Sequence, residues 1–306
     1  MNKLSILSLA LFIFFVLPNT RTGLCSEGYA GIETCKGCHD DKTEGFNKSM
    51  HGKLENPRTP AAKEGCESCH GSGVAHANEG GGKGVGGIFS FDKKVDSNSK
   101  SSKCLSCHEE TTHLAFWDNG RHKSAGISCD NCHSIHGGAE KGLKATQPEL
   151  CFGCHKNIKV MVNKQSHHPI KEGRMSCTSC HNPHGGFGEK MIKADSVNDL
   201  CFECHAEKRG PFRFEHPPVV ENCLNCHQVH GSNHNYMLVR KPPQLCQSCH
   251  DSSATVIHQM PMYNSRDSFN GDDIDSRRNR FVSRSCMNCH TNIHGSNSTG
   301  NKSFRR

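Results

Sequence analysis

The feature that most constrains this chain of 306 residues is a short box, C-x-x-C-H, that occurs ten times. A single box could be half of a zinc site, a redox-active dithiol or a chance match. It is also the attachment signature of c-type haem, in which both thiols bond the porphyrin and the histidine ligates the iron. Zinc sites and disulfide frameworks do not need a histidine after every second cysteine. Because all but one of the 21 cysteines lie in complete boxes, the sequence predicts ten covalently bound haem c groups.

The boxes supply both the attachment cysteines and one iron ligand each. The predicted attachment residues are Cys35, Cys38, Cys66, Cys69, Cys104, Cys107, Cys129, Cys132, Cys151, Cys154, Cys177, Cys180, Cys201, Cys204, Cys223, Cys226, Cys246, Cys249, Cys286 and Cys289. The box histidines are His39, His70, His108, His133, His155, His181, His205, His227, His250 and His290.

The composition indicates that the haems replace an ordinary hydrophobic core. Only 33% of the residues are hydrophobic, with one tryptophan and three tyrosines, so the polypeptide alone has little to bury. We therefore expect a multihaem cytochrome c fold that is elongated and haem-cored, mostly irregular, with short α-helices and almost no β-structure. Residues 149–159 and 199–208 are candidates for such helices.

The net charge of +7 does not indicate a nucleic-acid partner. No basic stripe or array of base-stacking aromatic residues is visible, and both are typical of nucleic-acid-binding domains. The propionates of the predicted haems would also offset the positive charge. We expect no nucleic acid among the partners.

Residues 1–25 read as a signal peptide. Lys3 precedes an apolar run from Leu4 to Leu17, followed by Pro18 and a polar segment. About 14 apolar residues are too few for a bilayer span of about 20 and suit the hydrophobic region of a signal peptide. An uncleaved anchor is one alternative, and a lipoprotein cysteine at Cys25 is another, which the bulky Leu24 before it disfavours. Export agrees with the chemistry, because c-type haem is attached outside the bacterial inner membrane.

A repeat of about 46 to 48 residues organises the boxes into pairs. Each copy holds a histidine, a box, an x-x-His-Gly segment and a second box preceded by leucine. Three clear copies, one looser copy and one half copy assign ten further histidines as second iron ligands: His51, His76, His122, His136, His168, His184, His216, His230, His258 and His294. His113, His167 and His234 fall outside this register and are interpreted as surface or propionate-contacting residues. The Gly-rich residues 80–87 interrupt the looser copy.

The short spacing inside the x-x-His-Gly segment limits which iron its histidine can reach. The Cα atoms of two ligands on opposite faces of a haem lie roughly 13 Å apart, whereas three extended residues span only about 10–11 Å. His184 therefore cannot share an iron with His181, nor His136 with His133, nor His230 with His227. Each must reach another haem, which would hold neighbouring porphyrins close together.

Ten box histidines and ten second ligands favour electron transfer over catalysis. An iron with two imidazole ligands is saturated, so it passes electrons but has no open site for a substrate. A multihaem oxidoreductase needs at least one open iron, for which the sequence offers no variant box. A soluble periplasmic shuttle or electron capacitor remains an alternative to a fixed conduit.

Several segments resemble one known family. They are residues 205–212 (HAEKRGPF), 219–231 (VVENCLNCHQVHG), 243–250 (PQLCQSCH) and 285–297 (SCMNCHTNIHGSN), with looser similarity back to Cys35. On these motifs the chain resembles the MtrA/DmsE family of decahaem cytochromes over nearly all of its predicted mature length.

The resemblance implies a protein that carries electrons across the outer membrane inside a large β-barrel porin. It implies two pentahaem modules in tandem, here 26–160 and 161–306. It also implies a periplasmic or inner-membrane cytochrome as donor and an extracellular multihaem cytochrome as outer partner. The expected location is the periplasm and outer membrane, and the expected role is respiration with an extracellular mineral or another terminal acceptor.

Overall fold

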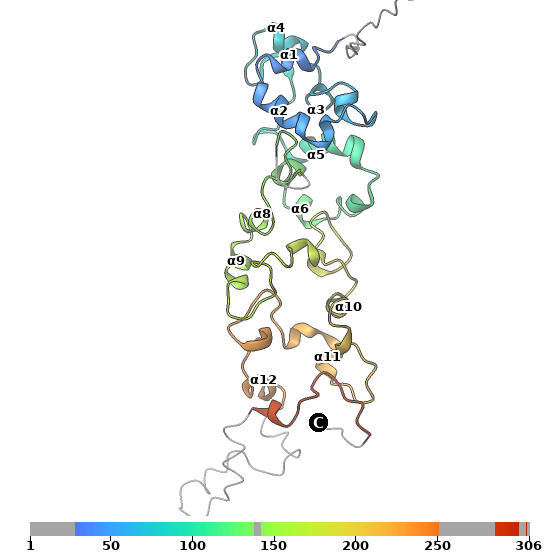
Figure 1. Cartoon of the computed structure of the whole chain (residues 1–306), viewed down its shortest axis with the longest axis vertical. Coiled ribbons are helices and arrows are strands. Elements are labelled where there is room, and N and C mark those ends of the chain that lie inside the picture. The colour runs from blue at the N-terminus through green and yellow to red at the C-terminus, as the bar shows by residue number, and fades with distance from the viewer. Residues whose placement is uncertain (1–27, 138–141, 251–284, 300–303, 305–306) are drawn as a thin grey trace, which may run out of the picture. The chain divides into compact units, whose positions relative to one another are not determined.

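The computed structural model describes residues 28–137, 142–250, 285–299 and 304 (Figure 1). The described residues up to Ser90 form one compact unit, and those from Phe91 onward form a second. The module boundary expected at residues 160/161 stays a prediction. The signal peptide and His258 lie outside the described residues. Among the helices of the described part, none is both long and apolar enough to cross a membrane.

The first unit contains four short helices. They are α1 (Ile32–Lys36), α2 (Asp40–Lys48), α3 (Glu67–His70) and α4 (Val74–Asn78). Single 3-10 turns occur at η1 (Met50–Gly52), η2 (Pro60–Ala62) and η3 (Val85–Gly87).

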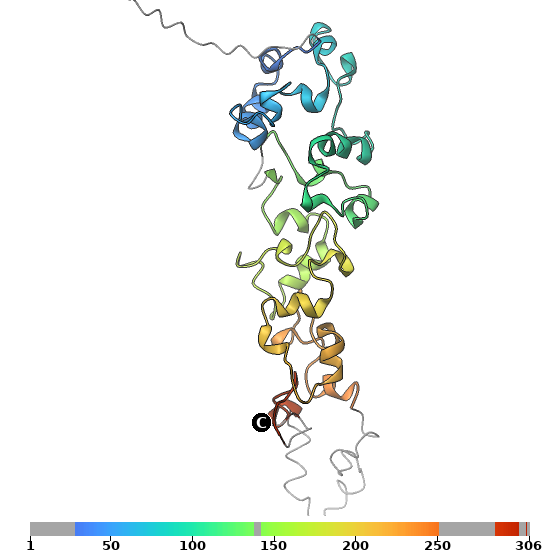
Figure 2. The ribbon, with the colours of Figure 1, turned by 90° about the vertical axis from the view of Figure 1, so that its right-hand side faces the viewer.

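The second unit is built in the same way, with helices of four to twelve residues. They are α5 (Ser97–His108), α6 (Arg121–Ser124), α7 (Cys129–Cys132), α8 (Glu149–Phe152), α9 (Lys156–Val162), α10 (Val197–Phe202), α11 (Pro217–Glu221) and α12 (Gln244–Gln247). The 3-10 turns are η4 (Thr112–Leu114), η6 (Cys177–Ser179), η7 (Glu189–Met191), η8 (Ala206–Lys208), η9 (Cys223–Asn225), η10 (Asn235–Met237) and η12 (Cys286–Asn288). Within this unit the segments follow one another in chain order in both views (Figures 1 and 2).

The expected fold class is confirmed in its secondary structure. In the described ranges β-pairing consists of isolated bridges rather than strands. Three of them occupy equivalent places in successive repeats and join His133 to Leu143, His181 to Ile192 and His227 to Leu238. Two others join one repeat to the next, between Ser166 and Ser232 and between Phe214 and Ser296.

Polar residues directly before four boxes start the turn that presents the cysteines. Ser128 and Ser176 form capping boxes with Asn131 and Ser179. Asn222 accepts a hydrogen bond from the Leu224 amide at 2.8 Å, and Ser285 caps η12 in the same way. These caps satisfy amides that a one-turn helix cannot pair internally. Each cap therefore fixes where its box begins.

The two helices expected from sequence are both interrupted at a box histidine. Residues 149–159 form α8 and α9, which are separated at His155 with φ −86° and ψ 60°. Residues 199–208 form part of α10 and then η8, which are separated at His205 with φ −109° and ψ 48°. A continuous helix was the wrong expectation, because the box histidine itself adopts a non-helical conformation.

The hydrophobic core is as small as the composition predicts. Among described residues, the buried hydrophobic side chains are Phe46, Trp117, Phe152, Val162 and Ile192. They belong to different segments of the chain, so packing between aliphatic side chains holds little of this fold together.

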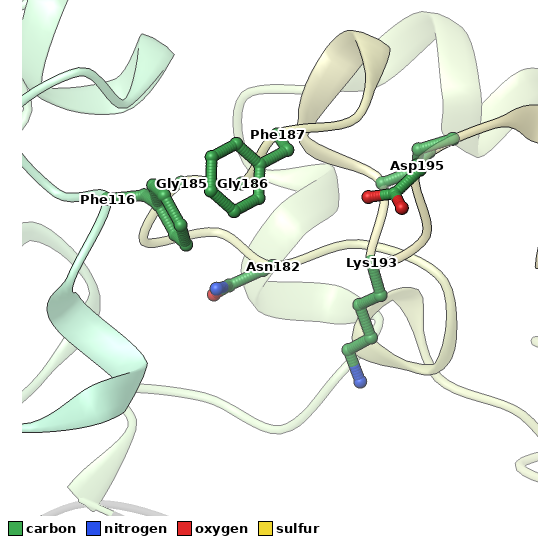
Figure 3. Close-up of a pocket in the computed structure, with 8 residues that line it drawn as sticks. Phe116, Asn182, Gly185, Gly186, Phe187, Lys193 and Asp195 are labelled. Carbon is green, nitrogen blue, oxygen red and sulfur yellow. The ribbon is translucent and has the colours of Figure 1, made fainter.

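The glycine after three of the predicted second ligands is required by a close backbone approach. A Cβ at Gly185 would lie 2.3 Å from the Phe116 carbonyl oxygen, and one at Gly231 would lie 2.0 Å from that of Met161. A Cβ at Gly295 would lie 2.2 Å from the Phe212 ring. Figure 3 shows Phe116 beside Gly185, in a shallow pocket that Phe187 and Lys193 also line. The His-Gly pair is thus where one repeat crosses the next.

Candidate haem-binding sites

Seven box histidines face a second histidine that the repeat had assigned as a ligand. The separations between ring centroids all fall between 6.1 and 6.4 Å. The pairs are His39–His76, His122–His155, His133–His184, His168–His205, His181–His230, His216–His250 and His227–His294. Five pairs have nearly parallel rings, with interplanar angles of 13–19°.

This spacing fits one iron between the two rings. Two metal–nitrogen bonds of roughly 2 Å, each extended by the distance from the nitrogen to its ring centre, give a centroid separation of about 6 Å. Each pair contains one histidine directly after a pair of cysteines, which places a covalent anchor beside every such gap. The donor set and its spacing both suit haem c.

In several of these imidazole rings, a backbone carbonyl determines which ring nitrogen can bind a metal. His122 Nδ1 lies 2.8 Å from the Pro183 carbonyl oxygen, and His168 Nδ1 lies 2.9 Å from that of Val229. Because a carbonyl can only accept, Nδ1 must carry the proton and Nε2 keeps its lone pair. Equivalent bonds join His70 to Phe89, His76 to Val85, His181 to Lys190 and His227 to Tyr236. Such a bond orients a metal-ligating imidazole and raises its basicity.

The pairs follow a regular rule in the second unit. The histidine that begins a repeat lies opposite the second box of the same repeat, as His168 lies opposite His205. The histidine after the first box lies opposite the first box of the preceding repeat, as His184 lies opposite His133. His184 therefore lies opposite a box other than the one it follows.

The first cysteines of consecutive boxes come into contact, a feature that sequence reasoning missed. The side chains interact in pairs, Cys35 with Cys66, Cys104 with Cys129, Cys151 with Cys177, Cys201 with Cys223 and Cys246 with Cys286, and each interaction shifts the pKa of a thiol. The second cysteines continue the series, since Cys132 interacts electrostatically with Cys151 and Cys154, Cys180 with Cys204, and Cys226 with Cys249. Within each unit, successive attachment points are neighbours.

Burial and these contacts set the protonation of the free side chains. Burial lowers the pKa of the His184, His216, His230 and His294 imidazoles, which favours the neutral form that binds metals. The hydrogen bond from Cys104 lowers the pKa of the Cys129 thiol to about 6, whereas burial raises that of Cys35 to about 11.

The remaining predicted ligands divide into two groups. His51 and His136 are described, and their assignment as second ligands stays a prediction; His258 lies outside the described residues.

Of the histidines outside the register, His113 is exposed and lies near enough to His184 to lower the pKa of His184, although burial and His133 lower it more. Nδ1 of His167 lies 2.6 Å from the Lys164 carbonyl oxygen, and its Nε2 lies 3.1 Å from Glu172 Oε1. The His167 side chain is 12% exposed, and its interpretation as a surface or propionate-contacting residue stays a prediction.

Comparison with known proteins agrees with this arrangement. The family model called doubled CXXCH motif matches residues 122–160, 167–210 and 216–255, which are the three clear repeats. The multiheme cytochrome MtrA of Shewanella baltica is 37% identical over 282 residues, covering 90% of this chain and 81% of the relative.

Two more distant similarities were found. The C-type polyheme cytochrome OmcB of Geobacter sulfurreducens is 27% identical over 60% of this chain, but the match spans only 27% of that protein. An undecaheme cytochrome from the S-layer of Carboxydothermus ferrireducens is a solved structure with 20% identity, covering 79% of this chain and 40% of that chain. Its TM-score of 0.14 is too low to indicate a shared arrangement.

Ten attachment boxes, facing histidine pairs and extensive similarity to a multihaem cytochrome lead to the same assignment. The chain is an electron-transfer protein with covalently bound haem c, and it belongs to the MtrA family of multihaem cytochromes.

Proposed function

We propose that this chain carries electrons through ten bis-histidine haems between the periplasm and the cell exterior, as part of an outer-membrane porin–cytochrome complex. The observation that carries the proposal is the set of seven histidine pairs with ring separations of 6.1–6.4 Å. Haem supplies a one-electron iron couple at each site. We assign the ten box histidines and the ten repeat-derived histidines as the ligands.

The polypeptide's own part in this function is to hold the haems in position and to separate them from solvent. The cysteines would anchor each porphyrin, the box histidine would supply one ligand, and another segment would supply the second. Carbonyl groups such as those of Pro183 and Val229 hold the second imidazole in the orientation needed for Nε2 ligation. Where two histidines would hold each iron, no open site would remain for a substrate, so we assign the chain no enzymatic role.

The cysteine contacts support a path that follows the order of the boxes within each unit. Thioether sulfurs at contacting positions, such as Cys151 and Cys177, would bring the edges of two porphyrins together. Electron hopping requires short edge-to-edge separations. Such a series of contacts within the second unit suits a conduit better than a set of independent carriers.

The location and partners rest on family membership. A member of the MtrA family with a signal-peptide-like start is expected to be exported and to function in the periplasm and outer membrane. We propose a β-barrel porin as its sheath, a periplasmic or inner-membrane cytochrome as donor and an extracellular multihaem cytochrome as outer partner. The terminal acceptor would be extracellular, such as a metal or mineral.

Two measurements test this proposal. Intact mass of the mature protein should show ten haem additions, and electron paramagnetic resonance should show low-spin iron throughout. Fewer haems or a high-spin component in the native protein would contradict the ligand assignment. Purification from outer membranes should also recover a large β-barrel protein in stoichiometric amounts. Quantitative release as a free carrier would instead support a soluble periplasmic shuttle.

A further inference from the structure

The first unit contains a buried charge that the haem sites do not use. Glu67 lies inside the second box, between Cys66 and Ser68, and its side chain retains only 4% exposure. Glutamate is rarely buried to this extent without a compensating partner. A buried carboxylate within an attachment box therefore requires an explanation.

Three backbone amides enclose the Glu67 carboxylate. Oε1 accepts hydrogen bonds from the Ala30 amide at 2.8 Å and from the Gly73 amide at 2.7 Å. Oε2 accepts one from the Gly31 amide at 2.9 Å. An ionised carboxylate has only acceptor positions, so an enclosure made of donors suits the charged form. These three partners are neutral amides rather than cationic side chains, so they add no positive charge to the carboxylate.

The charge lies between two attachment points. Gly31 is the N-cap of α1, which carries Cys35, and Glu67 follows Cys66 directly. The Cys35 and Cys66 thiols interact with each other. After burial and the neighbouring Cys66, Glu67 also raises the pKa of Cys35, and it contributes in the same direction at Cys66. Both sulfurs therefore experience its field.

A fixed negative charge near a haem favours the oxidised iron, which carries one more positive charge than the reduced iron. Burial strengthens this effect, because water screens the interaction less than at the surface. The potential of an iron centre depends on such local charges and on burial as well as on its ligands.

We propose that Glu67 sets the potential of the first two haems, holding those attached at Cys35/Cys38 and Cys66/Cys69 lower than an uncharged residue would. The inference rests on the proposed haem ligation and adds a residue that acts through charge rather than by touching iron.

The test is a redox titration of the full-length holoprotein with Glu67→Gln. The substitution is made in a His76→Met background so that one haem, the one attached at Cys35/Cys38, can be followed separately. Histidine–methionine ligation raises the reduction potential of that haem above the range of the bis-histidine haems. At a fixed potential, Glu67→Gln should change the ratio of oxidised to reduced iron at this haem about tenfold toward reduced, a shift of 59 mV for a one-electron couple. An unchanged or lower potential would overturn the proposal.

Two controls separate charge from structure. Glu64→Gln removes an exposed carboxylate one turn away, which hydrogen-bonds Ser68, and should leave the ratio nearly unchanged. Glu67→Asp keeps the charge while shortening the side chain, so its potential should stay near that of the parent. Equal shifts in the Asp and Gln variants would show that Glu67 acts by packing alone, and would refute a charge effect.

An independent variant covers failure of Glu67→Gln to fold. Ile88 lies beside the same enclosure, since its Cδ1 is 3.9 Å from a Cβ built at Gly73, which itself would lie 3.4 Å from Glu67 Oε1. Ile88→Lys should neutralise the carboxylate in place and raise the potential in the same direction; no rise would overturn the proposal. Haem number by mass and low-spin signals in the parent protein test the ligation separately, so the two proposals can fail independently.

Discussion

The first unit and the repeats of the second unit solve the same problem in different ways. Both must hold two boxes next to each other and supply each box histidine with a facing imidazole. In the repeats the facing residue comes from another repeat or from the far end of the same one, as with His133 and His184. In the first unit His76 follows the second box and lies opposite His39 of the box before it.

The means of joining the boxes differ as well. Repeats are joined by backbone bridges, such as the one between Ser166 and Ser232. The first unit instead joins its boxes through the side chain of Glu67, which binds the amides of Ala30 and Gly31. Neighbouring repeats have equivalent segments, so a segment of one repeat can pair with a segment of the other. The first unit differs in sequence from that pattern and relies on a specific buried side chain.

Removing one facing histidine should give the largest effect in this comparison. We expect His184→Ala to convert one haem from low-spin to high-spin, because one iron loses an axial ligand. The affected haem should be the one attached at Cys129/Cys132, not the one at Cys177/Cys180. Electron paramagnetic resonance can show this when His184→Ala is combined with loss of either attachment pair. The high-spin signal should disappear only when Cys129 and Cys132 are replaced.

The first unit provides the contrasting case. His76→Ala should leave high-spin iron in the haem attached at Cys35/Cys38, which belongs to the box before the one that His76 follows. His113→Ala is the matched control, because His113 is exposed and outside the repeat register. If His113→Ala also produced high-spin iron, or if the His184 signal followed Cys177, the rule of facing pairs would be wrong.

Alanine in place of the crossing glycine should have a smaller but clear effect on stability. Gly231 has a φ of +142°, and a Cβ there would lie 2.0 Å from the Met161 carbonyl oxygen, so the backbone must move. We expect Gly231→Ala to lower the free energy of unfolding by about 3 kcal/mol, in the range of overpacking. Thermal unfolding of the holoprotein, followed by circular dichroism, measures the difference.

Gly137 offers a matched substitution at the equivalent place. Its φ is +121°, but no described atom lies within 4 Å of a Cβ built there. Gly137→Ala should therefore cost only the backbone strain, about 1 kcal/mol. Equal losses in the two variants would mean that conformation, not the crossing of two repeats, determines the need for glycine.

A charge difference among the repeats should give the smallest effect. Lys144 and Lys193 occupy equivalent positions, where their charges lower the pKa of Cys132 and Cys180 against the larger effect of burial. The third repeat has Val239 in this place, and its amide bonds the Cys226 carbonyl as the Lys193 amide bonds that of Cys180.

We expect Lys193→Val to lower the potential of its neighbouring haem and Val239→Lys to raise that of the equivalent haem. Both shifts should stay below the 59 mV of a tenfold change, because these side chains are exposed and salt screens them. Redox titration at low and high salt checks both sign and screening. Shifts of the same sign in both variants would exclude a simple charge effect.

The sequence predicts the composition of the sites better than their connections. The boxes identify the attachment residues because haem c chemistry needs both cysteines and the histidine. The repeat also selects the histidines that face seven of the boxes, while the reach argument excludes His181 as the partner of His184. The reach argument cannot select His133 from the remaining box histidines as the partner of His184, because this choice depends on how loops from two repeats cross.

Predictions for single segments and single side chains failed where the residues of a site adopt a conformation or burial that their local sequence does not favour. The sequence favours short helices over residues 149–159 and 199–208, but His155 and His205 interrupt them. Glu67 gave no sequence signal either, because a charged residue between two cysteines normally faces solvent. Its burial follows from the folding of residues 30–31 and 73 around it.

The crossing of the histidine pairs has a consequence for how such a protein withstands unfolding. If iron joins each pair, it closes a loop of chain, and the loop from His133 to His184 overlaps the one from His168 to His205, which overlaps the one from His181 to His230. Each closure lowers the entropy of the unfolded chain, and loops of roughly fifty residues gain more than short ones. The metal centres would then act as interlocking cross-links, so that a chain with almost no hydrophobic core resists being pulled apart one repeat at a time.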